Sequence, residues 1–444
     1  MNLPKTVGVV SLGCSKNRVD TENMLGILAK AGITPVADPA KAEIIIVNTC
    51  GFILPAREES IDAIFDMARY KTMGTCKLLF VTGCLSQRYP QALKSEMPEV
   101  DAILGVGDYP RIVEAIEEAL KGEKPVYTSS RERFFECGRV LTTPGYSAYV
   151  KISDGCDNRC SYCAIPLIRG SYSSRPYDDA VNEMNRLAKG GVTEITLIAQ
   201  DTSRYGNDFP GGKTLLAQLI KSACSIDSVK WVRTLYCYPD TVDERLLDVI
   251  AGNEKACNYL DLPLQHINAD ILKRMNRRGS PEYIRRLIDE CRSRNIIVRT
   301  TMMVGFPGET DEQFEELMEF VEQARFARLG AFTFSPEEGT PAFDMPGQID
   351  EDVKKERLDR LMTLQRGISA SINASRVGSV EKVLVEGRRG SKCYGRSSLE
   401  APEVDPSIIF TPVSDHSPGD YVFVSIDSSS DYDLYGHESG GDSD

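Results

Sequence analysis

Three cysteines near the middle of the chain, Cys156, Cys160 and Cys163, follow one another at a C-x3-C-x2-C spacing. Three thiolates can hold three corners of a cubane iron–sulfur cluster and leave one iron open, whereas ferredoxin-type sites use four cysteines. A structural zinc site needs a fourth Cys or His ligand, and none follows at a suitable spacing. A redox pair of Cys160 and Cys163 leaves Cys156 unexplained. The spacing therefore favours a cluster whose open iron binds a small molecule and passes it an electron.

Three further cysteines, Cys14, Cys50 and Cys84, each follow a short hydrophobic run in the N-terminal part of the chain. These runs alternate with helical patterns, which predicts a parallel sheet whose carboxyl strand ends lie at one edge. One such cysteine is most often a packing residue, but three at equivalent positions predict a second three-thiolate cluster with an open iron. The other cysteines are expected to be packing residues: Cys76, Cys137, Cys224, Cys237, Cys257, Cys291 and Cys393.

The elements that position these cysteines form three predicted domains of an α/β protein. Residues 1–121 alternate strand and helix signals, which predicts a doubly wound parallel sheet. Residues 122–141 are expected to be a linker, because Gly, Pro, Ser and Thr interrupt the periodicity. Residues 142–375 carry six strands with crossover helices and predict a partial (βα)6 barrel, whose active site would lie at the carboxyl strand ends. Residues 376–442 predict a small all-β, OB-like module whose last residues fray.

Other residues at the same end of the predicted barrel can contribute to a ligand site. Gly305 and Glu309 bound a Gly-rich turn after the fifth strand, which lets backbone approach a ligand, although most such turns only join a strand to a helix. Gln200 follows the second strand and can bind a polar group. Arg175 closes the cysteine loop, where it can neutralise a carboxylate or equally lie on the surface.

Composition excludes several classes of protein. The 444 residues include 13 cysteines and 3 histidines and carry a net charge of −13. An odd cysteine count without an export signal argues against a disulfide framework, and so few histidines argue against a His-rich zinc hydrolase. The longest aliphatic run, Ile44–Val47, is too short to span a membrane, so a cytoplasmic location is expected. The acidic balance argues against nonspecific nucleic-acid binding.

The motifs around these residues resemble those of the radical SAM methylthiotransferases over the whole chain, in particular those that modify the twelfth protein of the small ribosomal subunit. The matching segments are Ser11–Asn17, Asn48–Phe52, Thr82–Leu85, Lys151–Cys160, Ile198–Thr202, Leu262–His266 and Met275–Gly279. The C-terminal module, with Tyr394–Ser397 and Ala401–Asp405, is similar to a TRAM domain. It departs from that family at Asp405-Pro406-Ser407, where a glycine usually follows the acidic residue.

The resemblance implies a two-cluster enzyme that uses S-adenosylmethionine (SAM). Each cysteine set would hold one [4Fe–4S] cluster, and the open iron of the Cys156 set would bind SAM and release a 5′-deoxyadenosyl radical. A methylthio group held at the Cys14 set would then replace a C–H bond on the β-carbon of one aspartate. No side-chain base can deprotonate such a carbon at pH 7, so a radical route is chemically reasonable. The implied SAM contacts are Tyr162 against the adenine and Arg175, Gln200, Gly305 and Glu309 elsewhere.

The implied partners are a basic ribosomal protein as substrate and a reductase or flavodoxin-type electron donor, with no membrane and no direct nucleic-acid readout. From Arg376 to the end the chain has 6 basic and 13 acidic residues. The sequence therefore predicts that acidic side chains of this module, including Glu400, Glu403 and Asp405, steer the basic substrate. The alternative is that the acidity only aids solubility and that the barrel rim contacts the substrate.

The nearest alternative is the related tRNA-adenosine methylthiotransferase, which applies the same chemistry to a nucleic acid. The segments Cys14–Asn17 and Gln265-His266 look like the ribosomal-protein enzymes instead, and an acidic C-terminal module is a poor surface for phosphates. A noncatalytic iron–sulfur electron carrier is a further alternative. Such a carrier needs neither a six-strand barrel nor open iron sites.

Overall fold

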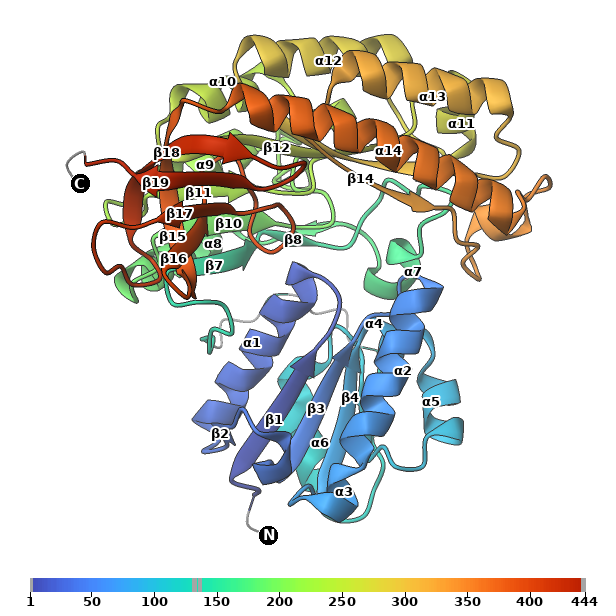
Figure 1. Ribbon diagram of the computed structural model, residues 1–444. Coiled ribbons are helices and arrows are strands. Elements are labelled where there is room, and N and C mark those ends of the chain that lie inside the picture. The colour runs from blue at the N-terminus through green and yellow to red at the C-terminus, as the bar shows by residue number, and fades with distance from the viewer. Residues whose placement is uncertain (1–2, 130–133, 135–137, 441–444) are drawn as a thin grey trace.

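The computed structural model describes residues 3–129, 134 and 138–440 (Figure 1). Its N-terminal domain is a parallel sheet in the order β2-β1-β3-β4-β5-β6 with helices on both faces, which confirms the predicted doubly wound architecture. The strands are β1 (Thr6–Ser11), β2 (Thr34–Pro35), β3 (Ile44–Thr49), β4 (Leu78–Gly83), β5 (Ala102–Leu104) and β6 (Val126–Tyr127). The helices are α1 (Ser15–Lys30), α2 (Leu54–Ala68), α3 (Tyr70–Met73), α4 (Cys84–Arg88), α5 (Pro90–Glu96) and α6 (Ile112–Ala119).

The central strands of this sheet are apolar on both faces, because helices cover both. Ile44–Val47 is fully buried: Ile44 and Ile46 pack toward α1 and α6, and Ile45 and Val47 toward α2 and α5. Strand β6 lies within the predicted linker 122–141 and pairs with β5, so the sheet extends past the predicted boundary at residue 121. Residues 130–133 and 135–137 of that linker lie outside the described residues.

The central domain is an open six-stranded parallel sheet in the order β14-β13-β12-β11-β10-β7, as expected for a partial barrel. Its strands are β7 (Ser147–Lys151), β10 (Glu194–Ile198), β11 (Trp231–Thr234), β12 (Ala256–Gln265), β13 (Ile297–Val304) and β14 (Arg328–Thr333). The helices are α7 (Ile165–Arg169), α8 (Tyr177–Lys189), α9 (Leu216–Cys224), α10 (Glu244–Gly252), α11 (Ala269–Arg274), α12 (Pro281–Ser293), α13 (Asp311–Ala324) and α14 (Glu351–Ser375). A two-stranded hairpin, β8 (Ser153–Asp154) and β9 (Ser173–Ser174), closes the loop that carries Cys156, Cys160 and Cys163.

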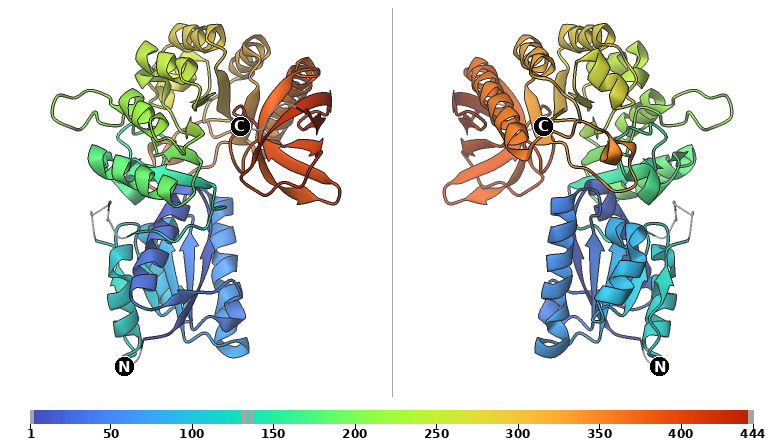
Figure 2. Two further views of the ribbon diagram at one scale, coloured as in Figure 1. Left: turned by 90° about the vertical axis from the view of Figure 1, so that its left-hand side faces the viewer. Right: turned by 90° about the vertical axis from the view of Figure 1, so that its right-hand side faces the viewer.

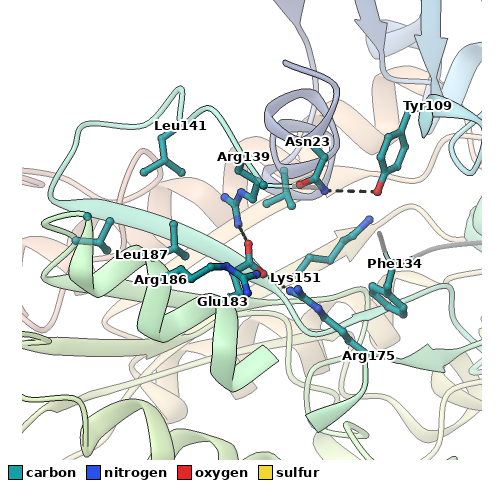
Figure 3. Close-up of a pocket in the computed structure, with 14 residues that line it drawn as sticks. Asn23, Tyr109, Phe134, Arg139, Leu141, Lys151, Arg175, Glu183, Arg186 and Leu187 are labelled. Carbon is teal, nitrogen blue, oxygen red and sulfur yellow. Dashed lines mark hydrogen bonds and ion pairs between the residues drawn. The ribbon is translucent and has the colours of Figure 1, made fainter. Parts of the chain in front are cut away.

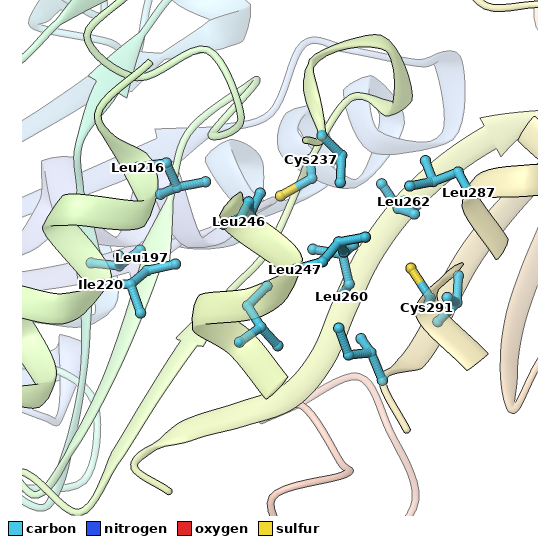
Figure 4. Packing of buried hydrophobic residues seen from close by; sticks show 14 of the residues in the cluster. Leu197, Leu216, Ile220, Cys237, Leu246, Leu247, Leu260, Leu262, Leu287 and Cys291 are labelled. Carbon is cyan, nitrogen blue, oxygen red and sulfur yellow. The ribbon is translucent and has the colours of Figure 1, made fainter. Parts of the chain in front are cut away.

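Leucines, isoleucines and cysteines fill the layer between the barrel strands and their helices. Figure 4 shows Leu260 and Leu262 on β12 beside Leu247 of α10 and Cys291 of α12. Six of the seven cysteines predicted as packing residues are buried: Cys76, Cys224, Cys237, Cys257, Cys291 and Cys393. The seventh, Cys137, lies outside the described residues.

The C-terminal module is a closed five-stranded barrel in the order β15-β16-β17-β19-β18, which confirms the predicted OB-like architecture. Its strands are β15 (Val380–Arg389), β16 (Lys392–Arg396), β17 (Ile408–Thr411), β18 (Tyr421–Ser429) and β19 (Leu434–Glu438). The expectation that the last residues fray is wrong for β19, which pairs with both β17 and β18 and closes the barrel. Residues 441–444 lie outside the described residues. No helix in the described part of the chain is long and apolar enough to cross a membrane.

The C-terminal module lies beside the central domain (Figure 2), and its Leu384 packs in one cluster with Trp231 and Cys257, at the amino ends of β11 and β12. The rings of Trp231 on β11 and Tyr421 on β18 meet edge to face at 5.0 Å. Beside them the fully buried Glu194 accepts two hydrogen bonds from Arg396, of 3.0 and 2.8 Å. The module therefore covers the end of the barrel opposite to the cysteine loop.

Two of the acidic residues singled out for substrate steering instead hold the module in place. Glu400 is buried and accepts hydrogen bonds from Arg328 and Arg376, at 3.0 and 2.5 Å. Burial opposes its ionisation, but these two guanidinium groups bring the pKa of Glu400 down to about 2. Asp405 accepts a 2.7 Å hydrogen bond from the Tyr259 hydroxyl, and Glu403 accepts one of 3.2 Å from Tyr149. The prediction of a steering role is therefore wrong for Glu400 and Asp405, whose buried carboxylates are engaged by the protein itself, whereas Glu403 is exposed and its steering role stays a prediction.

Replacement of Arg396 should test how strongly the module is held. Arg396→Met leaves the buried Glu194 carboxylate without its main partner, a change that costs about 3–5 kcal/mol in buried pairs. We expect a clearly lower urea midpoint in equilibrium unfolding. The matched control is Arg388→Met, because Arg388 pairs with Asp415 on the surface of the same module and should contribute about 1 kcal/mol or less. Equal midpoints for the two variants would contradict a stabilising role of the buried pair.

Candidate active site

Cys14, Cys50 and Cys84 come from three neighbouring strands of the N-terminal sheet. Cys14 precedes α1 after β1, Cys50 follows β3, and Cys84 begins α4 directly after β4. Because β1, β3 and β4 are adjacent and parallel, their carboxyl ends bring the three loops to one edge. None of the three thiols is in a disulfide.

Asn17 in the first turn of α1 ties these three loops together. Its side-chain amide donates hydrogen bonds to the carbonyl of Leu12, at 3.1 Å, and to that of Thr49, at 2.9 Å. Its carbonyl oxygen lies 3.6 Å from the sulfur of Cys84. One fully buried side chain thus contacts the segments on which all three cysteines lie.

A buried network of charges connects this edge to the central domain. The Arg169 guanidinium at the end of α7 binds Asp154 on β8 at 2.9 Å, and Asp20 on α1 at 2.9 Å. Lys151 of β7 binds the same two carboxylates, at 2.5 Å to Asp20 and 2.9 Å to Asp154. Arg169 also donates a 2.7 Å hydrogen bond to Asn17. The network therefore fixes the N-terminal cysteine edge against the loop that carries the second cysteine set.

The loop of Cys156, Cys160 and Cys163 is folded by its own backbone and by the segment after α11. The Cys156 amide donates to the Gly170 carbonyl at 3.1 Å, and the Cys163 amide to the Cys160 carbonyl at 3.0 Å. The Arg277 guanidinium lies 3.8 Å from the Cys160 sulfur. A cation thus lies beside each cysteine set, Arg169 at 4.0 Å from Cys84 and Arg277 at Cys160.

The surroundings of the thiols set their ionisation. Burial raises the pKa of Cys156 to about 11 and that of Cys84 to about 12, and raises the pKa of Cys163 further. Cys14 differs from these three: desolvation opposes its ionisation, but the charges of Lys16 and Arg169 lower its pKa. The thiols of Cys84, Cys156 and Cys163 therefore favour the protonated form at neutral pH in the absence of metal, and iron binding must displace their protons.

The donor chemistry of both cysteine sets suits three-thiolate clusters. Within residues 3–129, 134 and 138–440, no three His, Cys, Asp or Glu side chains converge closely enough to hold one metal ion. A cubane cluster differs from a single ion because each thiolate binds a different iron, so its sulfurs stay apart. The free thiols and the adjacent cations Arg169 and Arg277 suit an anionic iron–sulfur group.

Gln200 follows β10 and is a candidate ligand-binding residue. Its nitrogen and oxygen are both buried, and neither has a hydrogen-bond partner among the described residues. Buried amide atoms without a partner are costly, so a polar group supplied by a ligand would satisfy them. The adjacent Asp201 is already bound by Asn158 of the cysteine loop, at 2.8 Å.

Tyr162 lies between Cys160 and Cys163 and packs on an apolar cluster that includes Met275 and Phe306. Its hydroxyl oxygen accepts a 3.1 Å hydrogen bond from Arg277. The ring is therefore held beside the cysteine loop, where it can face a bound cofactor.

Two of the predicted cofactor contacts are engaged elsewhere. The buried Glu309 carboxylate accepts two 3.1 Å hydrogen bonds from the Gly305 amide and one of 2.7 Å from Arg357, so it holds the Gly-rich turn. Arg175 is paired with Glu183, which also binds Arg139 at 2.6 Å (Figure 3). The Arg175 charge therefore already has a carboxylate partner. The pair borders a cavity of about 330 Å³ between α1 and α8.

Several site residues were missed by the reasoning from sequence alone. Asn17, Lys151 and Arg277 lie inside the motifs Ser11–Asn17, Lys151–Cys160 and Met275–Gly279, so their position in a motif was the available signal. Arg169 and Asp20 lie outside every motif, and only the contact between domains reveals them.

Comparison with known proteins identifies the family. Residues 150–321 match the radical SAM superfamily, residues 6–105 the uncharacterized protein family UPF0004, and residues 377–437 the TRAM domain. The chain is 47% identical to the ribosomal protein uS12 methylthiotransferase RimO of Pelotomaculum thermopropionicum, over 97% of this chain and 98% of that one. The chain belongs to the ribosomal protein uS12 methylthiotransferase family.

Other members of this methylthiotransferase family agree. The Clostridium tetani enzyme is 46% identical over 97% of both chains, and that of Trichlorobacter lovleyi 47% identical over 98% of both. The solved structure of the radical SAM methyltransferase TsrM from Kitasatospora setae, with cobalamin and a [4Fe–4S] cluster bound, has a TM-score of 0.55. The alignment covers 86% of this chain and 77% of the TsrM chain at 14% sequence identity, which shows a shared fold. The chain is thus a radical SAM transferase that uses SAM and [4Fe–4S] clusters.

The close packing at the N-terminal cysteine edge can be tested at Gly83. A Cβ atom at Gly83, where φ is +97°, would lie 2.3 Å from Asn48 Oδ1 and 2.6 Å from the Thr49 carbonyl oxygen. Gly83→Ala should therefore displace Cys84, cost about 1–3 kcal/mol of stability beyond backbone strain, and lower the iron content after reconstitution. Gly122→Ala is the matched control, since φ is +87° there and no atom lies within 4 Å. Wild-type iron content and stability in Gly83→Ala would contradict this packing.

Proposed function

We propose that this protein attaches a methylthio group to the β-carbon of one aspartate in ribosomal protein uS12. The observation that carries this proposal is the placement of two three-cysteine sets on facing domains, locked together by the buried Arg169 network. The relatives named as uS12 methylthiotransferases supply the substrate, because they match nearly the full chain at 46–47% identity.

Each cysteine set would hold one cluster, Cys14, Cys50 and Cys84 the first, and Cys156, Cys160 and Cys163 the second. When bound, the second cluster and SAM supply the electron and the radical source, and the first cluster supplies a site for sulfur. The chain's own residues do the positioning. Tyr162 provides an aromatic face beside the second set, and the unpartnered amide of Gln200 would bind the polar end of SAM.

In this proposal the loops around the cofactor are held in place by Arg175, Gly305 and Glu309. Glu309 and Arg357 hold the turn that begins at Gly305, so that its backbone can approach the cofactor. Gly305 suits this close packing, since a Cβ atom there would lie 2.3 Å from Lys354. Arg175 shapes the end of the cysteine loop through its pair with Glu183.

The proposed partners follow from the chemistry. The substrate is a basic ribosomal protein, so we place the reaction in the cytoplasm. The clusters need an electron supply, for which a reductase or a flavodoxin-type protein would serve. If tRNA were methylthiolated by the purified enzyme while uS12 was not, the substrate assignment would be overturned.

The second cysteine set should control SAM cleavage. Cys156→Ala, Cys160→Ala or Cys163→Ala removes one of three thiolates, so we expect 5′-deoxyadenosine formation to stop and the iron content to fall to about half. The measurement is chromatography of the nucleoside after anaerobic reconstitution and reduction with SAM. Cys291→Ala, which alters a buried packing cysteine, is the control and should retain both. SAM cleavage at the normal rate in a Cys160→Ala enzyme would disprove the assignment.

The first cysteine set should be dispensable for SAM cleavage and essential for the product. With Cys14, Cys50 and Cys84 all replaced by Ala, we expect 5′-deoxyadenosine to form, because the second set lies in another domain. Methylthiolation of uS12, measured by mass spectrometry, should stop. Normal methylthiolation by this triple variant would show that these cysteines are only packing residues.

A further inference from the structure

Lys16 is a buried cation at the contact between the N-terminal and central domains. It lies in the first turn of α1, two residues after Cys14, and the residue is 7% exposed. Its ammonium nitrogen sits 3.2 Å from the ring centroid of Tyr236, which follows β11 at the carboxyl edge of the barrel. Lys16 therefore reaches from the first cysteine set into the edge of the barrel where the second set lies.

No carboxylate pairs with the ammonium group of Lys16 in the described part of the chain, although its charge favours ionisation of the neighbouring Cys14 thiol. The other cations nearby do have a carboxylate partner: Arg18 on the same helix pairs with Glu403, and Lys151 pairs with Asp20. Burial of a cation without a carboxylate is costly, so proteins seldom leave one in place without a function.

The ring beneath Lys16 is held in a strained position. Tyr236 has a φ of 63°, in the left-handed region that bulky residues rarely adopt. Its amide donates a 3.0 Å hydrogen bond to Asp261, and its carbonyl accepts one of 3.0 Å from Thr202, two residues after Gln200. The aromatic face stabilises the ammonium group without neutralising it. The charge of Lys16 thus remains available to an anion beside the cysteine edge.

We propose that Lys16 binds the side-chain carboxylate of the target aspartate. This inference rests on the proposed function. In aspartate the β-carbon carries the carboxylate directly, so a carboxylate held at Lys16 places the reacting carbon beside Cys14 and its cluster. The same contact selects aspartate over asparagine, because a neutral amide gains far less from an ammonium group.

The test is a cycle of enzyme and substrate variants measured by binding. Reconstituted enzyme with SAM, but without reductant, is titrated with purified uS12 and with uS12 whose target aspartate is changed to asparagine. We expect wild-type enzyme to bind the aspartate form roughly 10- to 100-fold more tightly. Lys16→Met should bind both forms equally and as weakly as the wild type binds the asparagine form. Lys16→Arg, which keeps the charge, should retain a preference for aspartate.

Two controls separate this role from others. Arg18→Met removes the neighbouring cation, which already has a partner, and should keep the preference for aspartate. Lys16→Met should keep the wild-type iron content, because Lys16 is not a cluster ligand, while loss of its charge beside Cys14 should shift the electron paramagnetic resonance spectrum of the reduced clusters only slightly. Loss of iron, or an altered spectrum, together with an intact aspartate preference would overturn the proposal and assign Lys16 to the cluster instead.

The remaining outcomes are also decisive. If Lys16→Met does not fold, Lys16→Gln replaces it with the same expectation. The Lys16 assignment would be overturned if the wild type bound both uS12 forms equally, or if Lys16→Met kept the full aspartate preference. In either case the proposed function would stand as long as the wild type modifies uS12. If the wild type cleaves SAM but does not modify uS12 at all, the proposed function fails instead.

Discussion

The buried Arg169 side chain is the interaction on which the arrangement of the two domains depends. Its guanidinium is shared between Asp154 of the central domain and Asp20 of the N-terminal domain, with Lys151 between the same two carboxylates. Charges buried to this degree must be paired in good geometry, since an uncompensated one costs several kcal/mol. Few orientations of the two domains satisfy all four groups together. The network therefore defines how the two cysteine edges face each other.

A second buried contact supports this orientation on the other side of the cysteine edge. Arg88 at the end of α4 binds Glu337 at 2.8 Å, and also donates a 3.0 Å hydrogen bond to the carbonyl of Gly51, beside Cys50. Two ion-pair contacts thus flank the cysteine loops. The C-terminal barrel adds one ion pair at the margin of this contact, between Glu403 and Arg18 of α1, but most of its packing is against the central sheet. Its role in the structure is to cover the amino end of the open barrel.

The same cations serve both the fold and the chemistry. Arg169 pairs with two carboxylates and lies 4.0 Å from the Cys84 sulfur, and Arg277 joins the Cys160 sulfur to the Tyr162 hydroxyl. Positive charge at these positions favours thiolates over thiols and so opposes, in part, the desolvation that raises the pKa of Cys84 and Cys163. A site for anionic clusters can therefore be buried between domains without leaving its ligands protonated once iron is bound.

The sequence by itself determined the three-domain α/β architecture, the two cysteine sets and the family, because these depend on local periodicity and on spacing within short motifs. The hydrophobic runs before Cys14, Cys50 and Cys84 predicted the strands of a parallel sheet, and Cys156, Cys160 and Cys163 lie within one loop, so no distant contact was needed. Only the tertiary structure decided which charged side chains meet. Glu400 and Asp405 were predicted to be surface acids, but they accept hydrogen bonds from Arg328 and Tyr259. Arg169 binds Asp20, which is 149 positions away in the sequence. Such pairs arise where domains pack, and no local pattern of residue types encodes the partner that packing brings.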